Sequence, residues 1–202
     1  MNRKGLILFV ALSLTVAFGV GVIGCAGQKS MAKTAPPSKL LPVSVEVTSV
    51  ERLNAIAPKP PFQATDILVF RVTFKLSNPN DAVMKVEDLY FEAKVDDGTP
   101  DKTIVMAESM PGVAILAGEN LTWSPAAPLL YGGLLGSFLT RGVGGGEGVK
   151  GAVQKRDELW QDLGSDKKKF LIEGNVTASY PDSPNVAKAR TQFKTEFSIP
   201  KL

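Results

Sequence analysis

The fold is decided by residues 68–80, which read LVFRVTFKLSNPN. Every second residue from Leu68 to Leu76 is apolar, and Arg71, Thr73 and Lys75 stand between the apolar ones. Because a β-strand sends successive side chains to opposite faces, this alternation predicts a strand with one face in a hydrophobic core.

The triplet Asn78, Pro79 and Asn80 follows this strand and predicts a turn. Proline fixes φ near about −65°, and the asparagine amides can hydrogen-bond to nearby backbone groups. We therefore favour a structural role for the triplet, with direct contact to a partner or to sugar hydroxyls as the alternative.

The same period of two recurs along most of the chain after residue 42. Turn-forming residues such as Asp97-Gly98 and Pro181–Pro184 separate the runs. Roughly seven short antiparallel strands with turns between them predict an all-β sandwich. The further runs that alternate are 43–48, 89–96, 103–110, 113–117, 120–124, 170–180 and 192–199.

One segment, 129–151, departs from this period. It holds nine glycines among large apolar residues, and we interpret it as a Gly/Leu-rich loop. Directly after it, Val149, Val153, Trp160 and Leu163 fall at helical spacings. This spacing predicts one short helix over 149–163, which Gly164 can end.

The large apolar side chains of this region have two possible surroundings. They either pack on the sandwich as a lid over one end of its core, which we favour, or contact lipid or a partner protein. The residues concerned are Leu134, Leu135, Phe138 and Trp160.

The N-terminus has the pattern of an export signal. Arg3 and Lys4 precede an apolar run of 18 residues, Leu6 to Ile23. The run ends in Val22, Ile23, Gly24 and Cys25, which resemble the lipobox of bacterial lipoproteins. A permanent transmembrane helix is the alternative interpretation, since 18 residues is close to the length that a bilayer requires.

The lipobox resemblance implies three parts of the chain. Residues 1–24 are a signal peptide that is removed. Cys25 then becomes the first residue of the mature protein and carries the acyl chains, such as palmitate. Residues 25–42 are a tether rich in Lys, Ser, Ala and Pro, and 43–202 form the folded domain. In such proteins an aspartate after the cysteine signals retention in the inner membrane; the residue here is Ala26, which favours the outer membrane.

Composition excludes several classes of function. The chain has 202 residues with no histidine and one cysteine, so the usual Ser/His/Asp and Cys/His catalytic sets and His/Cys zinc sites cannot be built. The formal charge of +3 falls to +1 without Arg3 and Lys4, and gives no support for nucleic acid binding. We expect no enzyme activity, no cofactor and no metal.

A family resemblance rests on the motif around Asn78-Pro79-Asn80. The alternating strand that runs into this triplet, followed by Val83, Val86 and Asp88-Leu89-Tyr90-Phe91, resembles the core of the WHy domain in late-embryogenesis-abundant proteins of group 2 (LEA type 2). The resemblance implies a fibronectin-III-like sandwich without catalytic residues and an association with stress responses.

These observations lead to one expected function and two alternatives. We expect a lipid-anchored protein on the periplasmic face of the cell envelope, with a WHy-like domain for binding or stress protection. The alternatives are an accessory subunit of an envelope complex and a carrier that holds lipid between its sheets. The expected partners are therefore the membrane, through the acyl chains on Cys25, and an envelope protein or a lipid.

Overall fold

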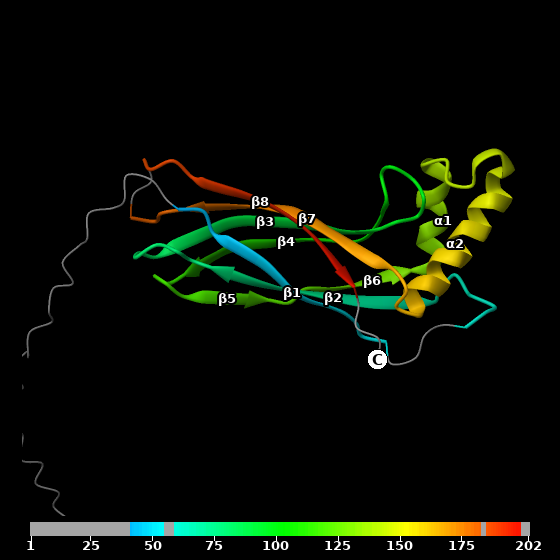
Figure 1. The fold of residues 1–202 in the computed structure, drawn as a ribbon, viewed down its shortest axis with the longest axis horizontal. Helices are drawn as coiled ribbons and strands as arrows, with labels where there is room; N and C mark the ends of the chain where they lie inside the picture. The colour runs from blue at the N-terminus through cyan, green and yellow to red at the C-terminus, as the bar shows by residue number, and fades with distance from the viewer. Residues whose placement is uncertain (1–40, 55–58, 183–184, 199–202) are drawn as a thin grey trace, which may run out of the picture. The chain divides into compact units, whose positions relative to one another are not determined.

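The alternating residues form two antiparallel sheets that face each other (Figure 1). This computed structural model describes residues 41–54, 59–182 and 185–198. The strands are β1 Ser44–Arg52, β2 Ile67–Ser77, β3 Met84–Val95, β4 Thr103–Ile115, β5 Asn120–Trp123, β6 Ala126–Leu130, β7 Lys169–Ser179 and β8 Ala189–Ser198. The helices are α1 Tyr131–Thr140, the short 3-10 helix η1 Gly145–Glu147 and α2 Gly148–Gly164.

In the first sheet, β2 pairs with β1 on one side and with β5 and β6 on the other. The second sheet has the order β4-β3-β7-β8. Because β5 and β6 both pair with β2 and are separated only by Ser124 and Pro125, they form one interrupted strand. Seven strands, three facing four, then make the β-sandwich that the alternation predicts.

The strand of residues 68–76 is the centre of the core, as predicted. In β2 the five alternate apolar residues from Leu68 to Leu76 are all buried. Phe74 packs edge-on against Phe91 of β3, with ring centroids 4.7 Å apart, and Phe70 packs against Phe170 of β7 at 5.3 Å. Aromatic side chains from both sheets therefore fill the space between them.

Several strands differ from the predicted runs: β1 extends to Arg52 and β3 begins at Met84, and two further differences have a structural reason. The runs 103–110 and 113–117 form one continuous strand, β4, because β3 pairs with it from Met84 to Val95 and bridges the break in pattern. Strand β6 was not predicted, since Ala126–Leu130 does not alternate and contains Pro128. Proline is tolerated there because β6 pairs with β2 alone and needs no second ladder.

The prediction of a loop over 129–151 is wrong, since most of this segment is helical. Tyr131, Leu134 and Phe138 are the buried residues of α1, at positions i, i+3 and i+7. The glycines lower helix propensity, but the tertiary packing of this apolar face outweighs that cost. The domain therefore has two α-helices, and the helix predicted for 149–163 is α2.

Two glycines let the helical segment close on itself. A Cβ at Gly151 of α2 would lie 2.5 Å from the carbonyl oxygen of Gly144, and Gly144 has a φ of 115°. Side chains would keep these two backbones apart. The glycines in this segment thus serve close backbone packing.

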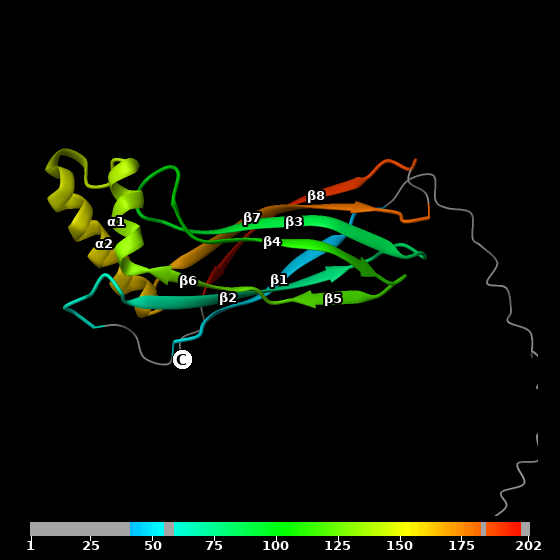
Figure 2. The ribbon, with the colours of Figure 1, turned by 180° about the vertical axis from the view of Figure 1, so that it is seen from behind.

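The helices and the Asn78-Pro79-Asn80 turn lie at opposite ends of the sandwich. Figures 1 and 2 show α1 and α2 at one end, packed against each other, and the turn between β2 and β3 at the other end. Leu41, the first described residue, lies at the turn end, since its backbone hydrogen-bonds to Asn80.

Candidate functional site

The Asn78-Pro79-Asn80 turn is a buried hydrogen-bonded junction. The side-chain amide nitrogen of Asn78 donates to the carbonyl oxygens of Ala82, Ile115 and Leu116 at 2.9–3.1 Å. Its side-chain oxygen accepts from the backbone N–H and the side-chain amide of Asn80.

Asn80 extends this junction to the start of β1. Its side chain accepts from the backbone N–H of Leu41 at 3.1 Å and donates to the Leu41 carbonyl at 3.3 Å. Both asparagines are buried, so few of their polar atoms are free to meet a ligand. The geometry supports the structural interpretation of the triplet: it joins three segments that are distant in sequence.

The apolar residues that could contact a partner are mostly inside the domain. Leu134, Phe138 and Trp160 are buried in the main core cluster, and Leu135 is half-buried against it. A contact with lipid or protein through the first three side chains is inconsistent with this burial. They fill the interior between α1, α2 and the end of the sandwich, which agrees with the favoured lid interpretation.

Trp160 and Tyr131 form the polar part of this helical core. Their rings meet edge to face at a centroid distance of 5.4 Å, and the buried indole N–H of Trp160 has no hydrogen-bond partner among the described residues. The Tyr131 hydroxyl donates to Asp157, and the guanidinium of Arg156 lies 4.0 Å from the centre of the tyrosine ring. Burial, with this bond to Asp157, raises the pKa of Tyr131 to about 12, so the phenol stays protonated.

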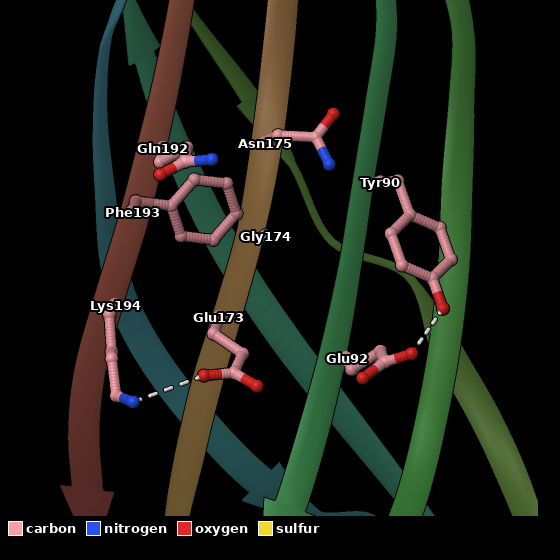
Figure 3. Close-up of a pocket in the computed structure, with 8 residues that line it drawn as sticks. All are labelled: Tyr90, Glu92, Glu173, Gly174, Asn175, Gln192, Phe193 and Lys194. Atoms are coloured by element: carbon pink, nitrogen blue, oxygen red, sulfur yellow. Dashed lines mark hydrogen bonds and ion pairs between the residues drawn. The ribbon is translucent and has the colours of Figure 1, made fainter.

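A polar hollow with aromatic side chains in its lining lies on the second sheet (Figure 3). It has a volume of about 410 Å³ and is open to solvent. Strands β3, β7 and β8 supply its walls, with Gly174 of β7 in the middle and the ring of Phe193 reaching towards it from β8. The residues that line it are Tyr90, Glu92, Glu173, Gly174, Asn175, Gln192, Phe193 and Lys194.

The charges at this hollow form one network. Lys94 lies 2.7 Å from a carboxylate oxygen of Glu92 and 2.7 Å from one of Glu173. Lys194 lies 3.3 Å from the other oxygen of Glu173, and the Tyr90 hydroxyl donates to Glu92 at 2.6 Å. The sequence did not single out these residues, because strand register alone brings them together.

This network fixes the protonation states of its members. Hydrogen bonds to Glu173 and Glu92 raise the pKa of Lys94, and the bond from Lys94 lowers the pKa of Glu173. Each carboxylate therefore stays ionised near neutral pH and each is already paired. The arrangement suits hydrogen bonding to a polar ligand, and it offers no poised acid or base for catalysis.

A second polar cluster surrounds Asp97 where β3 ends. The carboxylate accepts hydrogen bonds from the Thr99 side chain at 2.6 Å, from Thr103, and from Arg141 at 2.8 Å. Arg141 directly follows α1, so the cluster joins the helical segment to the β3–β4 turn. It is a structural junction, comparable with the asparagine junction at the other end.

Asp97 is expected to make stability depend on acidity. Burial alone would raise its pKa, but the hydrogen bonds from Thr103, Thr99 and Arg141 together lower it below the ordinary 3.8. A carboxyl with a lowered pKa stabilises the fold above its ordinary pKa and loses that contribution as pH falls through the folded value. Asp97→Asn should therefore lower the free energy of unfolding at pH 7 by roughly 1–3 kcal/mol, with a smaller difference from wild type below pH 3.8.

Urea titrations at a series of pH values measure this difference. Asp96→Asn is the matched control, since Asp96 is exposed and, among the described residues, accepts a hydrogen bond from the backbone N–H of Gly98 alone. A difference between Asp97→Asn and wild type that stays constant down to the lowest pH would contradict the assignment.

The predicted lipobox, Val22, Ile23, Gly24 and Cys25, with Cys25 as the predicted attachment residue, lies outside the described residues. Within the described part of the chain, no helix is both long and apolar enough to cross a membrane. The same part holds no group of three or more Cys, Asp or Glu side chains that could bind a metal ion.

Comparison with known proteins assigns no family. No family model and no curated protein matches the chain. Solved structures with a similar arrangement include a protein described as ApaA from Bordetella pertussis, at 10% identity and a TM-score of 0.44, over 82% of this chain and 100% of that one. A protein described as late embryogenesis abundant aligns at 11% identity and a TM-score of 0.40, over 79% of this chain and 72% of that one.

A third structure, the ASH/PapD-like domain of human CEP192, aligns at 8% identity and a TM-score of 0.36, over 84% of this chain and 92% of that one. Likenesses at this level identify neither a family nor a function. The class that the structure itself defines is an antiparallel β-sandwich with a helical pair at one end.

Proposed function

We propose that this chain is a non-enzymatic, lipid-anchored protein of the bacterial cell envelope, whose WHy/LEA2-like sandwich serves binding or stress protection. The observation that carries the proposal is Val22-Ile23-Gly24-Cys25 at the end of an apolar run that follows Arg3 and Lys4. The proposed position is the periplasmic face, with the outer membrane favoured because Ala26 follows the cysteine.

Acyl chains on Cys25 would hold the protein at a membrane without a spanning helix. Each buried methylene contributes about 0.8 kcal/mol, so two or three chains together give stable anchoring, whereas a single chain binds only weakly and reversibly. Cys25 carries the only thiol in the chain, so no disulfide within the chain and no second cysteine competes for the lipid.

A binding role without catalysis is supported by the composition and by the hollow on the second sheet. The chain has no histidine, and the carboxylates at the hollow are already paired with Lys94 and Lys194. Amide side chains from Asn175 and Gln192 and the exposed Tyr90 ring can still meet a polar ligand. This hollow is the proposed ligand-binding face of the module.

The lipid-carrier alternative is less well supported, because a carrier needs an apolar cavity between its sheets. Two pairs of buried aromatic rings that reach across the sheets, Phe70 with Phe170 and Phe74 with Phe91, occupy that space. The accessory-subunit alternative loses the docking surface proposed around Leu134 and Trp160, since both side chains are buried.

Replacing Cys25 with serine is expected to abolish acylation and membrane attachment. Serine lacks the thiol that receives the lipid, so labelled palmitate should not appear on Cys25→Ser, and the protein should leave the membrane fraction. Metabolic labelling with palmitate and membrane fractionation measure the two effects.

The matched control is a double variant that has its single cysteine at a different position. Cys25→Ser combined with Ser30→Cys restores one cysteine five residues further on, without Ile23-Gly24 before it. This double variant should also stay unlabelled. Palmitate on Cys25→Ser would show that the lipobox assignment is wrong.

Ala26→Asp tests the choice of membrane. Because an aspartate after the acylated cysteine signals retention in the inner membrane, this variant should stay acylated and move towards the inner-membrane fraction.

A further inference from the structure

Three exposed apolar side chains lie at the end of the sandwich where the described domain begins. Leu116, after β4, is 61% exposed; Leu41, before β1, is 55% exposed; and Val83, before β3, is 37% exposed. We call these three residues the tether-end patch. They come from three segments of the chain, and each is an apolar residue in a position where loops usually carry polar side chains.

The asparagine junction holds the three segments together. The side-chain amide of Asn78 donates to the carbonyl oxygens of Leu116 and of Ala82, the residue before Val83. Asn80 bonds to both the N–H and the carbonyl of Leu41. Since Asn78 and Asn80 are also bonded to each other, the patch is part of a fixed arrangement rather than three separate loops.

We propose that the tether-end patch rests on the membrane surface, with its apolar side chains in the interface between headgroups and acyl chains. This inference rests on the proposed acylation of Cys25. Sixteen residue steps separate Cys25 from Leu41, a length that spans at most about 55 Å even when fully extended. Leu41 is the first described residue and belongs to the patch, so the chain enters the domain at this end.

The opposite end cannot reach the membrane as readily. Strand β4, which runs from the helical end to the patch, has 13 residues and is therefore roughly 40 Å long. Contact through the helices would place Leu41 about that far above the membrane, so the tether would have to stretch to roughly twice the end-to-end distance of a flexible chain of this length, which costs chain entropy. With the patch downward, tethering gives an effective concentration in the millimolar range, so a small apolar surface suffices.

The charges near the patch favour apolar contact over electrostatic attraction. Asp81, Lys85 and Glu119 are exposed beside it and include both signs. Apolar side chains at an interface enter zwitterionic lipid without help from anionic headgroups. Contact should therefore occur on phosphatidylcholine vesicles and change little with added salt.

The experiment compares two positions of similar exposure at opposite ends of the domain. Val149 of α2 is 62% exposed and lies at the helical end, so it is the matched control for Leu116. Because an acylated Cys25 has no free thiol, L116C and V149C each add a single reactive thiol to the full-length protein. Each variant is labelled with an environment-sensitive fluorophore and reconstituted into phosphatidylcholine vesicles that contain doxyl-labelled lipid.

The expected result is quenching at position 116 that is at least about twofold stronger than at 149, since inserted side chains lie about 5–10 Å into the interface. A label at V83C should be quenched as strongly as a label at L116C. This second position shows that the quenching is not a local effect of one substitution. Equal or absent quenching at both positions overturns the inference. So does a blue-shifted label at 116 that doxyl lipid does not quench, because a second copy or another protein would then cover the patch.

Failure of the proposed function gives a different outcome. If Cys25 is not acylated, the wild-type protein does not float with vesicles and its own thiol reacts with the fluorophore. If the protein floats and its thiol is blocked while position 116 stays unquenched, the anchor is correct and the docking inference alone is wrong.

Discussion

Arg52→Ala is expected to lower the free energy of unfolding by about 3–5 kcal/mol, because it leaves a buried carboxylate without its partner. The guanidinium of Arg52 donates from Nε and Nη2 to the two carboxylate oxygens of Asp166, at 2.9 and 3.1 Å. The side chains are only 6% and 8% exposed. A third bond, from Nη1, reaches the carbonyl oxygen of Asn54.

This pair joins parts of the fold that no strand pairing connects. Arg52 is the last residue of β1 in the first sheet, and Asp166 lies in the turn between α2 and β7, which leads into the second sheet. Loss of the pair should therefore loosen the helical end as well as remove an interaction. Equilibrium unfolding in urea measures the first effect, and amide hydrogen exchange in α2 measures the second.

The matched control is Arg71→Ala in the neighbouring strand. Arg71 lies 3.7 Å from Glu51, but both side chains are more than 40% exposed. An exposed pair contributes about 0–1 kcal/mol, so this variant should unfold close to wild type. Similar losses for Arg52→Ala and Arg71→Ala would show that burial of the first pair is not the source of its effect.

Gly174→Ala should destabilise the domain by about 3 kcal/mol or more, because the added methyl group has no space. Its Cβ would lie 2.2 Å from the carbonyl oxygen of Tyr90, 2.9 Å from Cα of Phe91 and 2.7 Å from the ring of Phe193. Two of these three contacts are with backbone, so β3 and β7 would have to separate. Thermal and urea unfolding measure the loss.

Gly136→Ala makes the same chemical change at another position, and there we expect stability to rise rather than fall. Gly136 lies within α1, is exposed, and has no atom within 4 Å of the added Cβ. Alanine in a helix is favoured over glycine by about 0.8–1 kcal/mol, so this variant should be more stable than wild type. A Gly174→Ala variant as stable as wild type would mean that the sheet tolerates a side chain where the geometry excludes one.

Most strands could be predicted from the sequence because the period of two is a local property. Leu68, Phe70, Val72, Phe74 and Leu76 alternate without interruption, and the structure buries all five. The pattern states which face of a strand is buried, whatever strand it pairs with. The same locality explains the correct prediction of a turn at Asp97-Gly98, where Gly98 has a φ of 81°.

Helix α1 and strand β6 could not be predicted with the same reasoning. Gly132, Gly133 and Gly136 lower the helix propensity of α1, and Pro128 interrupts β6. Their conformations depend on neighbours: α1 packs on α2, and β6 pairs with β2, the central strand of the first sheet. Residues 131, 134, 135 and 138 do have helical spacing, and this was the available signal for α1.

The candidate functional residues, like the fold, fall into those that a local sequence pattern predicts and those that only the tertiary structure brings together. The sequence alone determined the alternating faces of the strands, the Asn-Pro-Asn turn and the prediction of acylation at Cys25, because each is a property of a short stretch of chain. Only the tertiary structure decided that Lys94 lies between Glu92 and Glu173, that Arg52 meets Asp166, and that Leu41, Val83 and Leu116 share one end. Such contacts join residues up to 114 positions apart, and strand register and sheet packing, which no local pattern encodes, bring them together.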